Sequence, residues 1–418
     1  MDAVRPHRPL RLVVLCPHFD PDTAPTGVVI SRIVDELVAL GHEINVVTAL
    51  PWYRDHAVVA EWSGRWIRRE QTTWGSITRV HPFPGSDRTN LLRRAVGFAG
   101  FSVLAAFAGV RGGRVDGVVS MSPPLTNGLI GWLIKVIRRG PLVFNIQDVF
   151  PDAAIQTGAL TNGTLIRVAR WLELISYRSA DAVTVLSADL RDNVVAKVGA
   201  GRAARVRVIP NFVLTDDITP MDRLTAYRAE LGIGSETVVM YAGNVGFSQS
   251  LDLLVHAAKA FPDVTFVING EGVAKHQLVS QVAELSNVRL GDYQPMSRLA
   301  EVLATGDIHV VPLKAGLGSV SVPSKTYSIL AAGRPALASI DAGTEVPRIL
   351  RASGAGVSVL PDDPAAFISA LGEMLADSDE CQAMGRRGRK WVLGAASPRA
   401  VAQEYEALLR ELGSGQRR

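Results

Sequence analysis

The segment from residue 316 to residue 335 carries residue types that suit an anion-binding loop. Glycine and serine lead to Pro323, a residue type favoured in the first turn of a helix, which we predict over residues 324–332. Ser321 or Ser324 is a candidate cap, and free backbone N–H groups and the positive end of the helix dipole face the loop. Because the dipole disfavours a cation in this turn, Lys325 indicates a nearby anion such as a diphosphate. The alternative is a solvated lysine on an ordinary helix.

Two further glycine-containing loops follow predicted strands in the same half of the chain. The first follows the strand over residues 237–241, and the second follows the strand over residues 265–269. Glycines with polar residues between them let a phosphate or a sugar approach the backbone closely. Loops of this kind at successive strand ends indicate a nucleotide crevice. The expected ligand contacts in these loops are Gly243, Asn244, Gly246, Gln249, Gly270 and Glu271.

Polar residues also follow predicted strands in the first half of the chain. Gly27 stands at the start of a predicted helix, where it would open backbone amides to a ligand or serve only a turn. Asp148 ends the strand over residues 142–147, so its carboxylate would bind a substrate hydroxyl, act as a base, or merely cap a helix. His18, Ser122 and Asp152 are further candidates near this edge.

The predicted strands and helices that must position these residues alternate along the chain in two successive series. The apolar run over residues 10–16 leads into a helix over residues 28–40 and a strand over residues 44–48, which is a βαβ unit. Short strands rich in valine and isoleucine are typical of parallel sheets covered on both faces. After residue 212 the sequence becomes polar. A second series of alternating strands and helices then begins. We predict an α/β fold with Rossmann-like domains over residues 1–212 and 213–394, and a last helix within residues 395–418.

Composition and charge exclude several classes of protein. The chain has 418 residues, which favours two or three domains, and its net charge of +4 is too small to favour nucleic acid as a partner. Cys16 and Cys381 lie far apart, as in a reducing compartment. The first ten residues lack a signal-peptide core, and the longest apolar run is shorter than the roughly 18–20 residues that span a bilayer. We therefore expect a cytoplasmic protein.

Three segments of the first half mix bulky apolar residues with arginine and lysine. They cover residues 91–114, 130–139 and 165–178. Such segments lie on anionic bilayers, or they are core helices with solvated arginines. Because all three fall in one predicted domain, we expect peripheral attachment to the cytoplasmic face of a membrane. This location suits a lipid-linked substrate.

In their order and spacing, the motifs resemble those of the retaining GT-B glycosyltransferases of family 4. The resemblance is greatest to the branch that assembles cell-surface polysaccharides such as colanic acid and O-antigen, and it covers about residues 10–410. Its carriers are Thr26-Gly27, Leu40-Gly-His42, Val46-Val-Thr48, Gln147-Asp148-Val-Phe-Pro151-Asp152, Val208-Ile-Pro-Asn211, Tyr241-Ala-Gly-Asn244, Gly270-Glu-Gly272, Pro323-Ser-Lys325 and Ala332-Gly-Arg-Pro335.

The resemblance implies two Rossmann-like domains that face each other across a cleft. It implies transfer of a sugar from a nucleotide-sugar with retention of anomeric configuration and without a metal. The donor then binds mostly to the second domain and the acceptor to the first, and the last helix crosses back to the first domain. Asp148 and Lys325 are the expected catalytic residues. The expected acceptor contacts are His18, Ser122 and Asp152.

The chain departs from the family pattern at the donor site. The family has two glutamates eight residues apart, and these positions hold Val320 and Ser328 here. Asn244 and Gln249 stand where the family has a basic phosphate clamp. We therefore expect Lys325 and its helix terminus to bind the diphosphate. The remaining expected donor contacts are Gly27, Ser324, Ser328 and Glu345, the last of which is alternatively a loop acid.

Two other functions fit parts of the pattern. A sugar-nucleotide epimerase of the same fold would need an acid–base cluster beyond Asp148 and Glu271, and a degenerate scaffold protein would explain the missing glutamates. A dehydrogenase would carry a G-x-G-x-x-G fingerprint, which the first loop lacks. We favour a UDP-sugar donor over a GDP-sugar and a lipid-linked or cell-envelope glycan as acceptor. The sugar, the linkage and the oligomeric state stay open.

Overall fold

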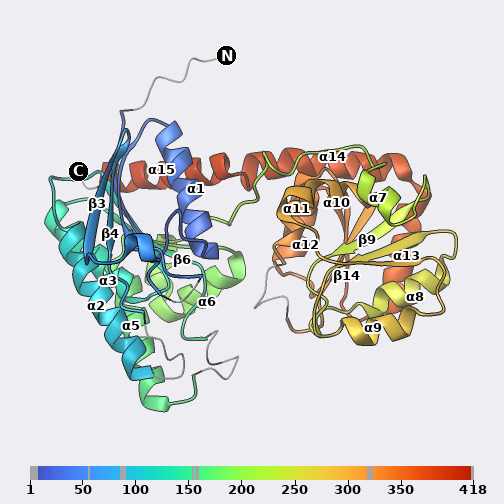
Figure 1. The fold of residues 1–418 in the computed structure, drawn as a ribbon, viewed down its shortest axis with the longest axis horizontal. Coiled ribbons are helices and arrows are strands. Elements are labelled where there is room, and N and C mark those ends of the chain that lie inside the picture. The colour runs from blue at the N-terminus through green and yellow to red at the C-terminus, as the bar shows by residue number, and fades with distance from the viewer. Residues whose placement is uncertain are drawn as a thin grey trace. The chain divides into compact units, whose positions relative to one another are not determined.

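A computed structural model describes residues 8–54, 57–84, 91–152, 155, 160–317 and 323–415. Val320, one of the two positions at which the family has a glutamate, and the candidate cap Ser321 lie outside these residues. The chain forms two compact units (Figure 1). The first contains the residues up to Asn211 together with those from Val401 onward, and the second runs from Phe212 to Ala400.

The first unit is built on an eight-stranded sheet in the order β3-β4-β2-β1-β5-β6-β7-β8. All neighbouring strands are parallel except β3, which pairs antiparallel with β4. The central strands are buried on both faces, which explains their continuous apolar sequences. The strands are β1 (Arg11–Leu15), β2 (Glu43–Ala49), β3 (Ile67–Thr72), β4 (Gly75–Val80), β5 (Gly117–Ser122), β6 (Leu142–Ile146), β7 (Ala182–Val185) and β8 (Val206–Val208).

The helices of the first unit follow the alternation that the sequence predicts. Helix α1 begins at Pro25, three residues before the predicted start at Val28, because proline is favoured in a first helical turn. Gly27 therefore lies inside this turn. No helix in the described ranges is long and apolar enough to cross a membrane. The helices are α1 (Pro25–Ala39), α2 (Leu91–Gly109), α3 (Thr126–Arg138), α5 (Gly163–Ser179) and α6 (Ala188–Val198).

The β3–β4 hairpin is an element that sequence patterning did not predict. Strand β3 has the sequence IRREQT and lies at the edge of the sheet, where Arg68 and Arg69 are exposed and Glu70 is half-buried. An edge strand needs no apolar run because one of its sides has no neighbouring strand to cover it. Its partner β4 carries the fully buried Arg79, which pairs with Glu70 of β3 at 2.9 Å. The pair holds the edge strand by an ionic contact that no period in the sequence reveals.

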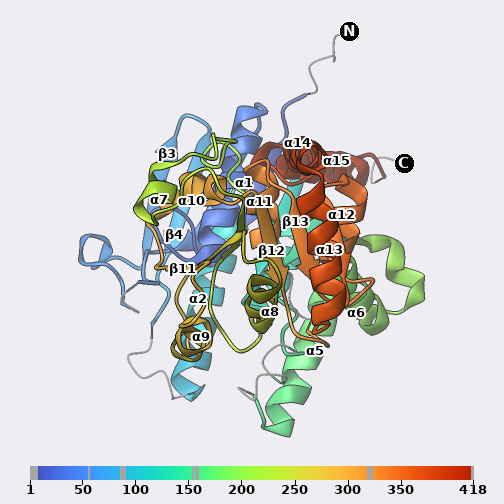
Figure 2. The same cartoon turned by 90° about the vertical axis from the view of Figure 1, so that its right-hand side faces the viewer.

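The second unit is built on a six-stranded parallel sheet in the order β11-β10-β9-β12-β13-β14. Figure 2 shows α8 and α13 side by side over this sheet, where they share a core with β9 and β10. Its elements are α7 (Ala226–Glu230), β9 (Val238–Ala242), α8 (Asp252–Ala260), β10 (Thr265–Asn269), α9 (Lys275–Val282), β11 (Val288–Gly291), α10 (Leu299–Thr305), β12 (Ile308–Pro312), α11 (Lys325–Ala331), β13 (Ala336–Ser339), α12 (Glu345–Ser353), β14 (Gly356–Val359), α13 (Pro364–Ala376) and α14 (Ser378–Ala395).

A buried polar chain ties the last helix, α15 (Pro398–Gly415), to the first sheet. The Nδ2 of Asn145 on β6 donates to the hydroxyl oxygen of Tyr405 at 2.8 Å and to that of Thr184 on β7 at 3.2 Å. The Oδ1 of Asn145 accepts from Gln147 at 2.7 Å, and Gln147 in turn accepts from Asn211 at 3.0 Å. These groups satisfy one another away from water, so the strand end, the helix and Asn211 hold each other in place.

We expect Tyr405→Phe to destabilise the first unit by about 1–3 kcal/mol, because Asn145 loses a buried hydrogen-bond partner while the ring still packs. Urea denaturation followed by circular dichroism measures the change. Tyr293→Phe is the matched control, since Tyr293 is 54% exposed, and its midpoint should stay at the wild-type value. Equal midpoints for the two variants would show that the polar chain does not stabilise α15.

Candidate phosphate-binding site

A cavity of about 420 Å³ lies in the second unit at the carboxyl ends of β9 and β12. Strand β9 ends at Ala242 and β12 at Pro312, and both residues line the cavity together with the start of α11. Ligands of open α/β sheets bind at this edge. The cavity brings together six of the eleven predicted donor contacts: Gly243, Asn244, Gln249, Ser324, Lys325 and Ser328.

Lys325 reaches into this cavity without a carboxylate partner. Its ammonium group donates to the hydroxyl oxygen of Tyr241 at 2.7 Å and lies 3.9 Å from the centre of the same ring. The Tyr241 hydroxyl donates onward to the carbonyl oxygen of Asn244 at 2.5 Å. Among the residues that the structure describes, no acidic side chain lies within ion-pair distance of Lys325. The buried charge therefore has only dipoles and a ring to stabilise it.

Burial lowers the pKa of Lys325 to about 7. A cation that has left water without a counter-ion loses most of its solvation energy, so the neutral amine becomes competitive. An anion bound in the cavity would reverse this balance and favour the protonated form.

Two glycines make room for the lysine and for each other. Gly243 has φ +147°, and a Cβ there would lie 2.7 Å from the Lys325 Nζ. Gly270 has φ +153°, and a Cβ there would lie 1.8 Å from the carbonyl oxygen of Gly243. Side chains are excluded at both positions, by strained backbone and by close backbone approach. The glycines of these two loops therefore shape the strand ends, and only Gly243 also lines the cavity.

The helix after Pro323 contributes less than its sequence suggests. Helix α11 has only seven residues, and Ser324 at its N-cap position makes no side-chain capping hydrogen bond. Ser324 has αR backbone angles, which a capping residue does not adopt. Its hydroxyl is exposed beside the cavity instead. The electrostatic character of the cavity therefore depends on Lys325 more than on a helix terminus.

The remaining residues of the two glycine loops have local roles. The backbone N–H of Gly246 donates to the Oε1 of Gln249 at 3.1 Å, which closes the loop after β9. Glu271 is half exposed and pairs with Lys275 at 2.5 Å. Glu345 opens helix α12 and pairs with Arg348 at 3.1 Å. Neither glutamate lines the cavity.

In the first unit, the loop after β1 holds a histidine–aspartate pair. The Nδ1 of His18 lies 2.6 Å from the Oδ2 of the buried Asp22, and the imidazole stacks on Trp52 with ring centres 5.6 Å apart. The Oδ1 of Asp22 accepts from the backbone N–H of Tyr53 at 3.1 Å. A Cβ on Gly27 would lie 2.9 Å from the Cβ of His18, so these two predicted residues are in contact. Both carboxylate oxygens of Asp22 are thus engaged by protein groups.

The other candidates of the first unit lie at the carboxyl ends of β5 and β6. Ser122 ends β5, and its hydroxyl is buried with no partner in the described part of the chain. Asp148 follows β6 and is exposed. Asp152 pairs with Lys197 at 2.7 Å and accepts from Asn193 at 3.2 Å. Burial raises the pKa of Asp152, but these contacts outweigh burial and the net shift is downward, as in a structural ion pair.

Tyr241 is the residue of this site that sequence reasoning missed. It is fully buried, and burial raises its pKa, so it remains a neutral hydroxyl beside Lys325. Its position as the penultimate residue of β9 resembles an ordinary core position in the sequence, and its contact with Lys325 is made across 84 residues. Over the described ranges, no group of three or more histidine, cysteine, aspartate or glutamate residues is placed to hold a metal ion.

The fold and this site define a class of enzyme. Two α/β units with parallel sheets and a cavity that suits phosphate constitute a GT-B glycosyltransferase that uses a nucleotide-sugar. Residues 26–211 match the family description "Glycosyl transferase 4-like domain", and residues 236–377 match "Glycosyl transferases group 1". The chain belongs to glycosyltransferase family 4.

Individual relatives agree with this assignment. The chain is 26% identical over 383 residues to WcaI of Escherichia coli K12, whose name links it to colanic acid biosynthesis, and the match covers 88% of this chain and 92% of WcaI. It is 28% identical over 303 residues to the glycosyltransferase WbjE of Pseudomonas aeruginosa, with 70% and 74% covered.

Solved structures share the fold. Sucrose-phosphate synthase from Thermosynechococcus elongatus superposes with a TM-score of 0.67 at 18% identity, covering 97% of this chain and all of that one. Anabaena HepE, solved in complex with UDP-glucose, superposes with a TM-score of 0.62 at 14% identity, covering 96% and 100%.

The depressed pKa of Lys325 predicts a pH-dependent stability. The unfolded chain keeps the lysine proton up to pH about 10.4, whereas the folded chain releases it near pH 7, so unfolding takes up a proton between these values. The free energy of unfolding of the wild type should therefore rise with pH from 7 to 10 relative to Lys325→Met, by at most about 1.4 kcal/mol per pH unit.

Urea denaturation at pH 7, 8, 9 and 9.5 measures this difference. Lys390→Met removes an exposed lysine of α14 and should keep the wild-type pH slope. Parallel pH slopes for the wild type and Lys325→Met would mean that Lys325 stays protonated in the folded protein.

Proposed function

We propose that the chain transfers a sugar from a UDP-sugar to a lipid-linked or cell-envelope glycan with retention of configuration. The observation that carries the proposal is the half-buried Lys325 in a cavity at the carboxyl ends of two strands, with no acidic partner in the described chain. The second unit holds the donor and the first unit binds the acceptor. GDP-sugars are the second choice of donor.

The proposed reaction depends on stabilising the leaving diphosphate. The bond between the anomeric carbon and the diphosphate oxygen breaks, and a bond to the acceptor oxygen forms on the same face of the sugar. The acceptor proton passes to the departing diphosphate, so no separate base is required. Lys325 takes up a proton from solvent when the donor binds, and its positive charge stabilises the negative charge that develops on the leaving diphosphate.

The choice of UDP is supported by a protein of similar fold, since Anabaena HepE was solved in complex with UDP-glucose. Within the donor cavity, Gly243 lets ligand atoms approach the backbone, and Ser324 and Ser328 offer hydroxyl groups. We assign to these groups the donor contacts that the glutamate pair and the basic clamp make in the family pattern and that this chain lacks.

In the first unit, we assign Asp148 to the acceptor hydroxyl. Its carboxylate is exposed at the carboxyl edge of the sheet, where β5 and β6 are neighbours. His18 lies on the same edge beyond β1 and is oriented by Asp22. It would donate a hydrogen bond to a sugar hydroxyl or accept one from it. Asp152 is engaged by Lys197, so we assign it to positioning the loop that carries Asp148.

We further propose that helices α2, α3 and α5 attach the first unit to an anionic bilayer. Helix α3 packs against both of the others. Large apolar side chains stand exposed along this group of helices, and on α5 they include a 61% exposed tryptophan. The exposed apolar residues are Val103, Phe107, Trp132, Val136, Ile137, Leu165, Val168 and Trp171.

The charges on these helices fit an anionic surface. Helix α5 exposes three arginines, namely Arg167, Arg170 and Arg178. After α2, the guanidinium carbon of Arg111 lies 3.7 Å from the centre of the Phe107 ring. The three helices contain a single acidic residue, Glu173, which is buried and bonded to a lysine. Apolar area with basic residues and no exposed acid is the composition of helices that lie in a membrane interface. The name of WcaI, which refers to colanic acid biosynthesis, is consistent with an envelope acceptor.

We expect Lys325→Ala to lower turnover with a UDP-sugar about 100- to 1000-fold, because the leaving diphosphate loses its charged partner. Transfer or hydrolysis of radiolabelled UDP-glucose and other UDP- and GDP-sugars measures the effect, and a thermal-shift assay with UDP and GDP identifies the base. Lys390→Ala should keep wild-type turnover. Turnover in Lys325→Ala equal to that of the wild type would refute the assigned role of Lys325. If the wild type binds UDP but neither transfers nor hydrolyses any donor, the scaffold alternative is favoured.

We expect the protein to float with liposomes that contain about one third anionic lipid, and to be released as salt is raised. Replacing Arg167 and Arg170 by glutamine should reduce the bound fraction several-fold, and Trp171→Ala should do the same. Exchange of Lys259 and Lys390, two exposed lysines of the second unit, for glutamine is the charge-matched control. Binding that is absent, or lost equally in the control, would argue for a soluble acceptor.

A further inference from the structure

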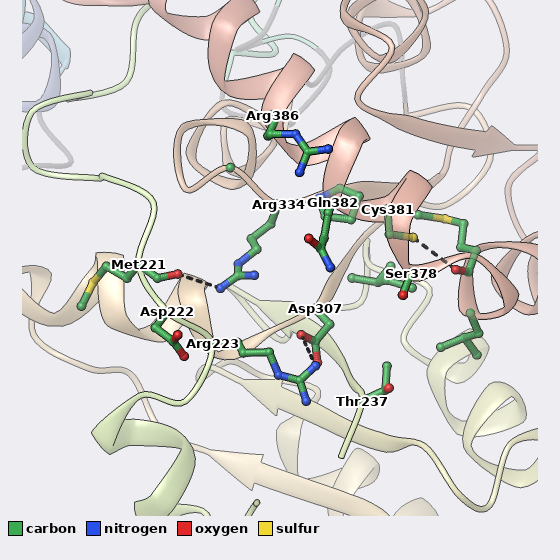
Figure 3. Close-up of a pocket in the computed structure, with 15 residues that line it drawn as sticks. Met221, Asp222, Arg223, Thr237, Asp307, Arg334, Ser378, Cys381, Gln382 and Arg386 are labelled. Carbon is green, nitrogen blue, oxygen red and sulfur yellow. Dashed lines mark hydrogen bonds and ion pairs between the residues drawn. The ribbon is translucent and has the colours of Figure 1, made fainter. Parts of the chain in front are cut away.

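A second cavity of about 410 Å³ lies in the same unit at the opposite edge of its sheet (Figure 3). Thr237, Asp307 and Pro335 line it, and each directly precedes a strand, namely β9, β12 and β13. The Lys325 cavity lies at the other ends of β9 and β12. The proposed sugar transfer makes no use of this second cavity.

Three arginines line the second cavity, and they differ in how far their charges are compensated. Arg223 pairs with Asp307 at 3.0 Å. Arg334 has no such partner: its Nη2 donates to the backbone carbonyls of Met221 at 3.0 Å and Ala304 at 2.7 Å. Its Nε is buried and bonds to no group in the described residues. Neutral carbonyls fix the guanidinium without cancelling its charge.

Arg386 adds a second uncompensated cation. It is exposed on α14 and forms no ion pair with any residue of the described ranges. In Figure 3, Arg386 and Gln382 extend from α14 on the side of the cavity that Arg334 also lines. Asp222 is the other carboxylate of the lining, and it accepts from the backbone N–H of Leu224 at 2.7 Å. Positive charge therefore exceeds negative charge around the cavity.

We propose that this cavity binds a small phosphate monoester at a site separate from the sugar donor. A phosphate monoester carries a charge of about −1.5 to −2 at pH 7, and the cavity offers it three guanidinium groups against two carboxylates. Guanidinium groups recognise phosphate oxygens through paired N–H donors, and Arg334 and Arg386 both line the cavity. The phosphate group lies between Arg334 and Arg386.

The rest of the cavity fits a compact organic body attached to the phosphate. Ile308, Met374 and Leu375 give it apolar walls, while Ser378 and Gln382 at the start of α14 offer hydrogen-bonding groups. A volume of about 410 Å³ is within the range of small-molecule sites, roughly 300–1,000 Å³. A phosphorylated monosaccharide or polyol has this combination of size, hydroxyl groups and charge.

Isothermal titration calorimetry of the full chain with glucose 6-phosphate tests the proposal. Saturating UDP is present throughout, so that the donor cavity is occupied. We expect one saturable site, at least tenfold weaker binding in Arg386→Gln, and weaker or undetectable binding of glucose and of inorganic phosphate alone. Lys390→Gln removes a neighbouring charge of α14 outside the cavity and should bind as the wild type does. Lys325→Ala should also bind glucose 6-phosphate normally.

Arg386 is exposed, so its substitution should leave the thermal midpoint and the rate of sugar transfer unchanged. No saturable binding to the wild type, or equal affinity in Arg386→Gln and Lys390→Gln, overturns the proposal. Binding that is lost in Lys325→Ala, or that is seen only when UDP is left out, would place the ligand in the donor cavity and would also overturn the proposal. A failure of the transferase assay alone leaves this binding result unaffected, so the two proposals are tested separately.

Discussion

The burial of the Lys325 ammonium group without a carboxylate partner is the constraint on which the donor site depends. Tyr241 supplies the hydroxyl and the ring face that hold the lysine, and the hydroxyl is itself held by a backbone carbonyl. Gly243 must lack a side chain for the ammonium group to occupy its position. Burial lowers the pKa of Lys325 to about 7, so an anion in the cavity would raise the protonated fraction of this lysine. A more conventional arrangement, with an arginine that is always charged, would not couple protonation to binding in this way.

The parallel sheet explains why the site is where it is. All strands of the second sheet run in one direction, so the loops after β9, β10 and β12 meet at one edge, and the loops before β9, β12 and β13 meet at the other. The first edge has Lys325, and the second has Arg223, Arg334 and Arg386. Helix α11 joins the two, because it begins at Lys325 and its last turn leads into Gly333 and Arg334. A unit with this topology presents two separate cationic cavities on one short segment of chain.

Several polar residues at strand ends serve the fold before they serve chemistry. Asn145 and Gln147 lie next to Asp148 in sequence, yet they bond to Tyr405 and Asn211 inside the first unit. Asp152 is held by Lys197, which also pairs with the buried Glu173. Burial raises the pKa of Glu173, and the lysine counteracts that shift. Such contacts make the strand ends rigid, and rigidity is what a positioned carboxylate such as Asp148 requires.

The sequence by itself determined the fold class, because short apolar strands alternating with amphipathic helices leave few other arrangements, and because its motifs occur in the order of family 4. It also indicated Lys325 and the loop after β9, since glycines and a lysine after successive strands suit a phosphate. It could not reveal the β3–β4 hairpin, whose charged edge strand has no apolar period. Only the tertiary structure decided the partner of Lys325, its pKa and the arginine cavity, because those depend on contacts between residues tens of positions apart.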